Sequence, residues 1–278
     1  MADLTGKTAL VTGSTRGLGE AIANTLARSG AATVVTGRNT EDGARVVGDI
    51  RSAGGTAEFV HLDLADESSV RGAFEEITAR FGRLDVLVNN AAPTEFVTGA
   101  ATGDIETKID DDVTHISTEA WHKITRVGID GLMWTLKYGI PVMLDSGGGS
   151  IVNISSVASI RGTRGVDGYT ACKGAMNALT LSTAVNYQPT IRSNCLVAGA
   201  FLTPGIAPLM ENPAFVQAFR DVLLTPSVGL PDQMAETVAF LASDAAAYIT
   251  GQILPIDGGL SVAAPVPKLA APIPGEAS

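Results

Sequence analysis

Short apolar runs alternate with longer segments of helical periodicity along most of this chain. The runs predict β-strands at residues 7–12, 32–36, 56–62, 84–88, 151–154, 191–197 and 252–256. Helices are predicted between them, at 20–30, 40–54, 66–82, 118–144, 169–179 and 232–243. Strands that alternate with helices pair in parallel through right-handed crossovers. The pattern predicts a single doubly wound α/β domain over residues 1–262, with its topological switch point between the first and fourth strands.

Three segments lack this pattern. Residues 93–117 lose the periodicity, and we expect a solvated acidic insertion beside the active edge of the sheet; its charges are Asp104, Glu106, Asp110, Asp111 and Asp112. Residues 200–228 are apolar, irregular and broken by prolines, which indicates a lid over a substrate pocket. The Ala/Pro-rich tail at 263–278 is expected to stay extended or to pack on a neighbouring subunit.

Composition narrows the classes of partner. The net charge of -10 argues against a nucleic-acid surface and against an anionic membrane surface, and no apolar run is long enough to span a membrane. The only cysteines, Cys172 and Cys195, form no disulfide framework and have no metal-ligand spacing, so we assign no metal. The first residues lack a signal-peptide pattern, and a reducing cytoplasm is the expected setting.

A glycine-rich turn, Gly13-Ser14-Thr15-Arg16-Gly17-Leu18-Gly19, joins the first strand to the first helix. Gly13 permits a tight turn, while Gly17 and Gly19 let the backbone and the helix approach a ligand closely. The N–H groups at the start of a helix favour an anion such as a pyrophosphate. The strand before the turn and the helix after it are the context that a dinucleotide-binding turn requires.

The residues at the ends of the next strands indicate which dinucleotide binds. Arg38 follows the second strand, where an acidic residue would bind a ribose 2'-hydroxyl, and Arg16 lies in the first turn. Arginines suit a 2'-phosphate, so NADP(H) is favoured and NAD(H) stays an option; alternatively, Arg38 only points to solvent. Asp63 and Leu64 follow the third strand, where Asp63 contacts a ligand, caps the next helix or does both. The small residues and amides at 89–92 let the backbone approach the cofactor.

Ser156, Tyr169 and Lys173 are the candidate catalytic residues. Tyr169 and Lys173 are four residues apart and share one face of the predicted helix, and Ser156 follows the fifth strand. A free phenol has a pKa of about 10, and a nearby ammonium lowers it toward the range of a useful general acid or base. The spacing alone is also compatible with an ordinary helix face.

In order and spacing, these residues resemble the classical short-chain dehydrogenase/reductase family over about residues 4–262. The resemblance rests on five motifs, at 12–19, 89–91, Ser156 with Tyr169 and Lys173, 250–252 and 257–259. It implies a Rossmann fold whose seven-stranded parallel sheet has the order 3-2-1-4-5-6-7, in a homotetramer or a homodimer.

The resemblance also implies a role for each site residue. Tyr169 would be the proton donor or acceptor, Lys173 would lower its pKa and hold the nicotinamide ribose, and Ser156 would bind the substrate carbonyl. Asp63 would contact the adenine and Asn89 would lie along the adenine ribose. The cofactor contacts implied elsewhere are Leu64, Ala91, Gly199, Leu202 and Thr203.

Three positions depart from the family pattern. Gly128 stands where an asparagine usually helps to hold a water in the proton relay. Ala198-Gly199 replaces the usual Pro-Gly, and the segment 89–92 lacks the common final glycine. The first departure puts the strength of the relay in question.

The sequence therefore predicts an NADP(H)-dependent oxidoreductase that interconverts a carbonyl and a secondary alcohol. The lid indicates an apolar substrate, such as a cyclic or steroid-like one, through Phe201, Leu209, Met210, Phe215 and Phe219. Arg161 and Arg164 either meet a carboxylate or phosphate on the substrate, or pair at the surface with the acidic insertion. The alternative function is a non-catalytic NADP(H)-binding or redox-sensing protein on the same fold.

Overall fold

The computed structural model describes residues 2–94 and 109–262, so most of the acidic insertion and the whole tail at 263–278 lie outside the described residues. Seven strands form one parallel sheet in the order β3-β2-β1-β4-β5-β6-β7, which confirms the predicted fold class. The strands are β1 (Thr8–Val11), β2 (Ala32–Gly37), β3 (Thr56–His61), β4 (Val86–Asn89), β5 (Gly149–Ser156), β6 (Ile191–Ala198) and β7 (Ile253–Ile256).

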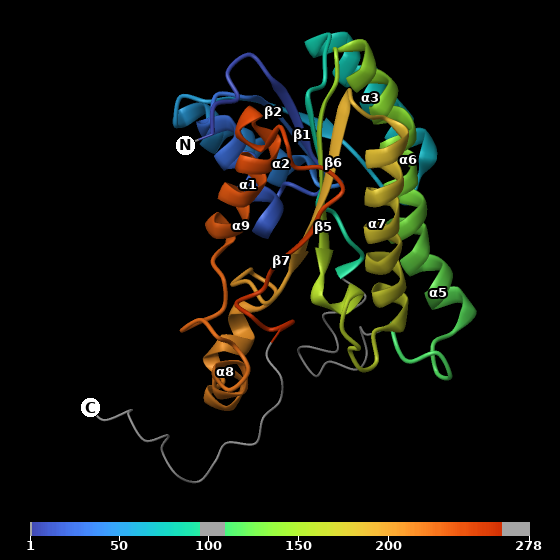
Figure 1. The fold of residues 1–278 in the computed structure, drawn as a ribbon, viewed down its shortest axis with the longest axis vertical. Helices are drawn as coiled ribbons and strands as arrows, with labels where there is room; N and C mark the ends of the chain where they lie inside the picture. The colour runs from blue at the N-terminus through green and yellow to red at the C-terminus, as the bar shows by residue number, and fades with distance from the viewer. Residues whose placement is uncertain (1, 95–108, 263–278) are drawn as a thin grey trace.

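Helices cover both faces of the sheet (Figure 1). One core lies between the sheet and α1 (Gly17–Arg28), α2 (Thr40–Ser52) and α9 (Pro231–Ala242). The other lies beneath α3 (Glu67–Phe81), α6 (Gly131–Asp145) and α7 (Asp167–Asn186). None of the described helices combines the length and the apolarity that a membrane crossing needs.

Local side chains set the bounds of several helices. Asn39 starts α2 by accepting hydrogen bonds from the backbone N–H groups of Glu41 and Asp42. Asp66 starts α3 in the same way, by accepting from Ser68 N. The cap of this helix, which the sequence left open for Asp63, is therefore Asp66. Gly82 ends α3 with a φ of 67°, a conformation that glycine adopts without strain.

The long helix predicted at 118–144 is continuous but not regular. It consists of α5 (Thr118–Thr125), a π-helical turn, η2 (Arg126–Asp130), and α6. Gly128 lies in that wide turn, where a Cβ atom would lie 2.5 Å from Cys172 Sγ on α7. The π turn therefore packs tightly against α7, and π turns often occur near functional sites.

The lid is more ordered than its prolines indicate, which corrects the prediction of an irregular segment. It contains a short 3-10 helix, η4 (Ala207–Glu211), and α8 (Pro213–Arg220). Pro213 occupies the first turn of α8, where its missing N–H has no partner to lose, and Asn212 caps that helix. No residue of α8 is buried, and the helix stands away from the sheet below the carboxyl ends of the strands (Figure 1).

Candidate active site

The predicted site residues gather at the carboxyl edge of the sheet. The glycine-rich turn follows β1, Asn89 ends β4, Ser156 ends β5 and Gly199 follows β6. Strands β1 and β4 are neighbours in the sheet, and the strand order reverses between them: β2 and β3 follow on one side, β5 to β7 on the other. The crevice at this topological switch point is where such sheets bind ligands.

The glycine-rich turn is shaped as a cradle. Gly13 and Gly17 have φ values of 63° and 59°, which glycine adopts readily. Gly19 brings α1 so close that a Cβ there would overlap Gly13 O and lie 2.6 Å from Asn90 Nδ2. Arg16, at the N-cap of α1, makes no capping hydrogen bond, so no N-cap side chain competes with an anion for the first turn. These residues fit a dinucleotide pyrophosphate.

Asn90 braces this turn from the end of β4. Its amide Nδ2 donates to Thr12 O (3.0 Å) and to Gly13 O (3.1 Å). The backbone N–H groups of Asn90 and Ala91 both donate to Thr12 Oγ1 at 3.0 Å. From the sequence, the amides at 89–92 were expected only to let the backbone approach the cofactor. The structure shows that the Asn90 amide also holds the glycine-rich turn in place.

Two residues of the turn point inward. Ser14 is fully buried; its Oγ donates to Val11 O (2.8 Å) and accepts from Thr36 N (2.9 Å). Leu18 packs against the core beneath α1. The backbone N–H of Ser14 is also engaged, since it donates to Thr36 O at 2.9 Å, so Ser14 shapes the turn from inside rather than facing the crevice.

Three arginines surround the outer end of the crevice. A Cβ on Gly37, at the end of β2, would lie 2.8 Å from Thr15 Cγ2. Arg38 and Arg16 follow these two residues directly, so they extend from neighbouring backbone segments. Both arginines are exposed. Arg45, which the sequence did not single out, donates to Thr15 O (3.0 Å). Its guanidinium also contacts the carboxylates of Glu20 at 2.8 Å and Asp49 at 3.2 Å, so α2 is tied to the turn.

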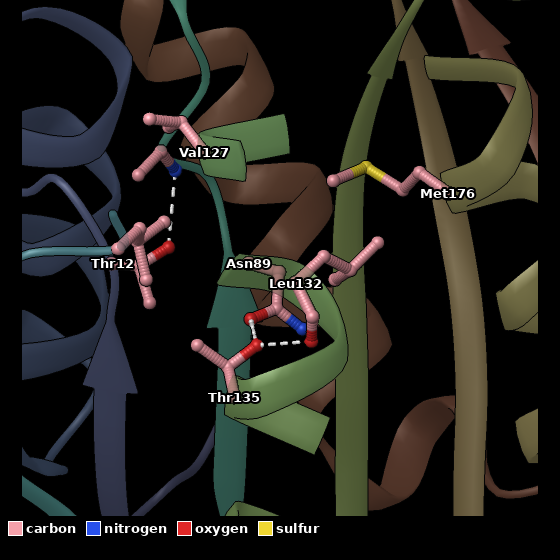
Figure 2. Close-up of a pocket in the computed structure, with 8 residues that line it drawn as sticks. Thr12, Asn89, Val127, Leu132, Thr135 and Met176 are labelled. Carbon is pink, nitrogen blue, oxygen red and sulfur yellow. Dashed lines mark hydrogen bonds between the residues drawn. The ribbon is translucent and has the colours of Figure 1, made fainter. Parts of the chain in front are cut away.

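The ends of β3 and β4 line the crevice. Asp63 is half-buried and accepts from Ala65 N (2.9 Å). Leu64 and Ala91 line a narrow pocket between the sheet and the π turn; its other residues are Thr12, Asn89, Val127, Leu132, Thr135 and Met176 (Figure 2).

Asn89 lies inside a buried polar network. Its Oδ1 accepts from Thr135 Oγ1 at 2.8 Å (Figure 2). Its Nδ2 donates to Asn153 Oδ1, also at 2.8 Å. Asn153 continues the network to Thr180 Oγ1 on α7 at 2.8 Å. The side chain of Asn89 thus joins β4 to α6 and β5.

The turn after β6 closes the crevice from the other side. Gly199 packs on Asp257, whose Cα would lie 2.5 Å from a Cβ at this glycine. Thr203 Cβ would lie 3.8 Å from a Cβ on Gly17, so the two turns adjoin. Leu202 is partly exposed beside them and donates its N–H to Gly229 O.

Ser156, Tyr169 and Lys173 come together as predicted. Ser156 ends β5, and the other two lie in the first turns of α7. The Ser156 side chain lies close enough to the Tyr169 hydroxyl to lower its pKa. Lys173 Nζ lies 5.6 Å from the centroid of the Tyr169 ring and donates to Ile154 O at 2.6 Å. The serine and the lysine therefore both lie beside the tyrosine.

The electrostatics of this group differ from the prediction. Burial raises the pKa of Tyr169, and the nearby Ser156 side chain opposes that rise. Burial also lowers the pKa of Lys173 to about 8. The expected lowering of the Tyr169 pKa by Lys173 is not found in the chain alone, because desolvation of the phenolate is the larger effect.

Two further contacts were not foreseen. Arg161 donates to the carbonyl of Ser261, near Asp257, so it contacts the C-terminal turn. Asp110, taken as a solvated charge of the insertion, is 1% exposed. Its carboxylate accepts from Gly168 N (2.9 Å) and Tyr169 N (2.8 Å). The sequence holds one indication of this contact: valine at position 166 cannot cap α7, so the start of the helix needs an acceptor from elsewhere.

Known proteins resemble the chain over almost its whole length. The family described as enoyl-(acyl carrier protein) reductase matches residues 13–261. The 7alpha-hydroxysteroid dehydrogenase of Clostridium sardiniense is 33% identical, over 95% of this chain and 97% of the relative. The cis-4-hydroxycyclohexanecarboxylate dehydrogenase of Sinomonas cyclohexanicum is 35% identical, over 91% and 96%.

A solved structure agrees with these relatives. The gluconate 5-dehydrogenase from Burkholderia cenocepacia, in complex with NADP and tartrate, superimposes with a TM-score of 0.83 at 32% identity, over 94% of this chain and 98% of that one. The chain therefore belongs to the short-chain dehydrogenase/reductase family and is a dehydrogenase that acts on CH–OH groups with NAD(P)+.

Proposed function

We propose that this dehydrogenase interconverts a secondary alcohol and a ketone on an apolar, cyclic substrate, with NADP(H) as the preferred cofactor and Tyr169 as the proton donor or acceptor. The observation that carries the proposal is the arrangement at the end of β5. The Ser156 side chain lies close enough to the Tyr169 hydroxyl to lower its pKa, and Lys173 Nζ lies 5.6 Å from the centroid of the Tyr169 ring.

Each residue has a defined task in this proposal. Ser156 holds the substrate oxygen beside the phenol, and Tyr169 gives that oxygen a proton in reduction or takes one in oxidation. Lys173 is fixed by Ile154 O, and its charge favours the phenolate that forms when the proton leaves. The bound nicotinamide supplies or accepts the hydride. Its pyrophosphate would lie on the turn at 13–19, which is shaped to hold it.

The preference for NADP(H) rests on Arg16 and Arg38. Both are exposed at the end of the crevice where the β2 strand meets the first turn. A planar guanidinium binds a phosphate through two parallel hydrogen bonds, which suits a 2'-phosphate. The solved relative from Burkholderia cenocepacia was described with NADP, which is consistent with this proposal.

The cyclic substrate is supported by two features. Two of the relatives are named for cyclic alcohols, a hydroxysteroid and a hydroxycyclohexanecarboxylate. The lid presents apolar side chains, including the rings of Phe215 and Phe219, which meet edge to face with centroids 5.0 Å apart. Phe201 anchors the base of the lid in the core.

The test is NADPH oxidation across cyclopentanone, cyclohexanone, a 7-ketosteroid and an open-chain ketone, with NADH alongside and Tyr169→Phe as the critical variant. We expect turnover to prefer NADPH and a cyclic ketone. Tyr169→Phe should lower kcat by about 10²–10⁴-fold, the usual contribution of a general acid. Tyr187→Phe, at the other end of the same helix, is the matched control and should keep wild-type turnover.

Turnover that survives in Tyr169→Phe would overturn the catalytic assignment. Tight NADPH binding without turnover on any ketone of the panel would favour the alternative of a non-catalytic NADP(H)-binding protein. A preference for NADH would overturn the proposed role of Arg16 and Arg38 while leaving the reaction in place.

A further inference from the structure

Helix α7 carries the catalytic pair but has no N-cap of its own. Val166, which precedes its first residue, makes no capping hydrogen bond. The first four N–H groups of a helix have no partner within it, and a buried helix start needs an acceptor from elsewhere. For α7 this acceptor comes from a segment that is 58 residues distant along the chain.

The acceptor is the carboxylate of Asp110. One oxygen accepts from Gly168 N at 2.9 Å and the other from Tyr169 N at 2.8 Å. The side chain is only 1% exposed, so little water competes for these bonds. Hydrogen bonds to a charged acceptor are among the stronger ones in proteins, and a carboxylate at a helix N-terminus also interacts favourably with the helix dipole.

Two further hydrogen bonds join the same two segments. Asp167 N donates to Asp111 O at 3.1 Å, and Val113 N donates to Asp167 Oδ2 at 3.0 Å. Gly168 allows the two segments to approach this closely, because a Cβ there would lie 3.0 Å from Asp110 Oδ1 and 3.1 Å from Ile124 Cδ1. Segment 110–113 and the first turn of α7 thus form one joint, which we call the α7 clamp.

We propose that Asp110 is a positioning residue for the reaction, because the α7 clamp holds the backbone of Tyr169 and with it the direction of the phenol. Tyr169 is directly bonded to the clamp through its own N–H, so a loosened first turn moves the residue itself. A displacement of about 1 Å at a reacting group costs on the order of 10²-fold in rate. The inference rests on the proposed role of Tyr169.

A local cap would serve helix stability equally well without crossing 58 residues of sequence. A serine or aspartate at position 166 would satisfy the same N–H groups. The long-range cap instead makes the geometry of Tyr169 depend on the docking of segment 110–113 beside the active site. Stability and positioning can therefore be separated by experiment.

The test compares Asp110→Ala and Asp110→Asn with Ser117→Ala. The control Ser117 caps the neighbouring helix α5 by accepting from Ala120 N at 3.1 Å, so its loss removes a helix cap but none of the hydrogen bonds of the α7 clamp. We expect Asp110→Ala to lower kcat on the fastest ketone of the panel at least tenfold, with the KM for the cofactor changed less than twofold. Asp110→Asn keeps one acceptor oxygen and should fall between Asp110→Ala and the wild type. Ser117→Ala should keep wild-type kcat.

Amide hydrogen exchange gives a readout that does not depend on activity. Exchange in the peptide 166–173 should accelerate in both Asp110 variants and stay unchanged in Ser117→Ala. Wild-type exchange and kcat in Asp110→Asn would overturn the proposal even if Asp110→Ala failed to fold.

Rescue separates positioning from simple capping. Val166→Thr keeps the shape of a buried side chain and adds a hydroxyl at the N-cap of α7. In the Asp110→Ala background it should restore part of the lost thermal stability but leave kcat low. Recovery of kcat by this local cap would overturn the proposal. Tyr169→Phe is measured in parallel: if it stays active, the proposed function fails, whereas if only the Asp110 variants stay active, the clamp inference fails alone.

Discussion

Gly128 leaves no space for a side chain at the position where the family pattern expects an asparagine. A Cβ there would lie 2.5 Å from Cys172 Sγ and 2.7 Å from Cys172 Cβ. Gly128→Asn should therefore destabilise the fold by about 1–3 kcal/mol, the usual cost of overpacking. Adding Cys172→Gly should recover part of that loss, so urea denaturation of the two single variants and the double variant should show non-additive free energies.

Gly48 on α2 is the control for this cycle. It is exposed and helical, and no atom lies within 4 Å of a Cβ built on it. Gly48→Asn should leave the free energy of unfolding within about 0.5 kcal/mol of the wild type. Additive costs at 128 and 172 would show that the π turn relaxes to admit the amide, and the relay asparagine could then be restored by a single substitution.

Because of Lys173, the free energy of unfolding should depend on pH in the alkaline range. Burial lowers its pKa to about 8 in the folded chain, whereas the unfolded chain keeps the ordinary value of about 10.4. Between these values the unfolded state binds more protons, so the free energy of unfolding rises with pH. Relative to Lys173→Met, we expect the cofactor-free wild type to gain about 2 kcal/mol between about pH 7.5 and 9.5. Denaturation curves of the two proteins that run parallel over this range would contradict the lowered pKa.

At the scale of elements, α2 supports the phosphate-binding turn through Arg45. The guanidinium donates to Thr15 O at 3.0 Å while Glu20 and Asp49 hold it in place. Arg45→Met should raise the Kd for NADPH about three- to tenfold, because the turn loses its brace. The free energy of unfolding should change by less than about 1 kcal/mol, since exposed ion pairs contribute little. Cofactor fluorescence measures the first quantity and urea denaturation the second.

Arg71→Met is the matched change for that comparison. Arg71 forms an exposed pair with Glu75 on α3, at 3.8 Å, and does not contact the turn. Its loss should leave the Kd unchanged. Equal effects of the two substitutions on the Kd would mean that Arg45 acts through general charge rather than through Thr15.

The elements show which features a sequence can reveal. The seven strands and the helix that joins Tyr169 to Lys173 follow from periodicity and motif spacing, the strand order follows from the family resemblance, and all are present. The π turn was not predicted because five residues of wider helix barely shift an apolar pattern. The inward side chains of Ser14 and Asn89 depend on tertiary partners, and the Asp110 cap joins residues 58 apart, so no local pattern contains them.

At the scale of the whole molecule, exposed apolar side chains remain on the helices that cover one face of the sheet. Leu181 and Val185 are 47% and 71% exposed and lie one turn apart on α7. Met133 and Leu144 on α6 are 41% and 40% exposed. Large apolar side chains grouped on one face typically mark a protein interface. The family resemblance predicts a homotetramer or homodimer, and we infer that a second copy covers α7.

The substitution Leu181→Glu with Val185→Glu tests this arrangement, because buried carboxylates facing their symmetry mates across a twofold interface would repel each other. We expect the wild type to have the mass of a dimer or tetramer by light scattering, and the double variant to lose that association through α7. A control with Tyr248→Glu, which is fully exposed and belongs to neither helix, should keep the wild-type mass. Because α7 also carries Tyr169 and Lys173, dissociation should lower kcat as well as mass if the neighbouring copy steadies the helix. A double variant with the wild-type mass would place the subunit contact on another face, and the exposed Phe240 and Leu254 on α9 and β7 would then be the next positions to charge.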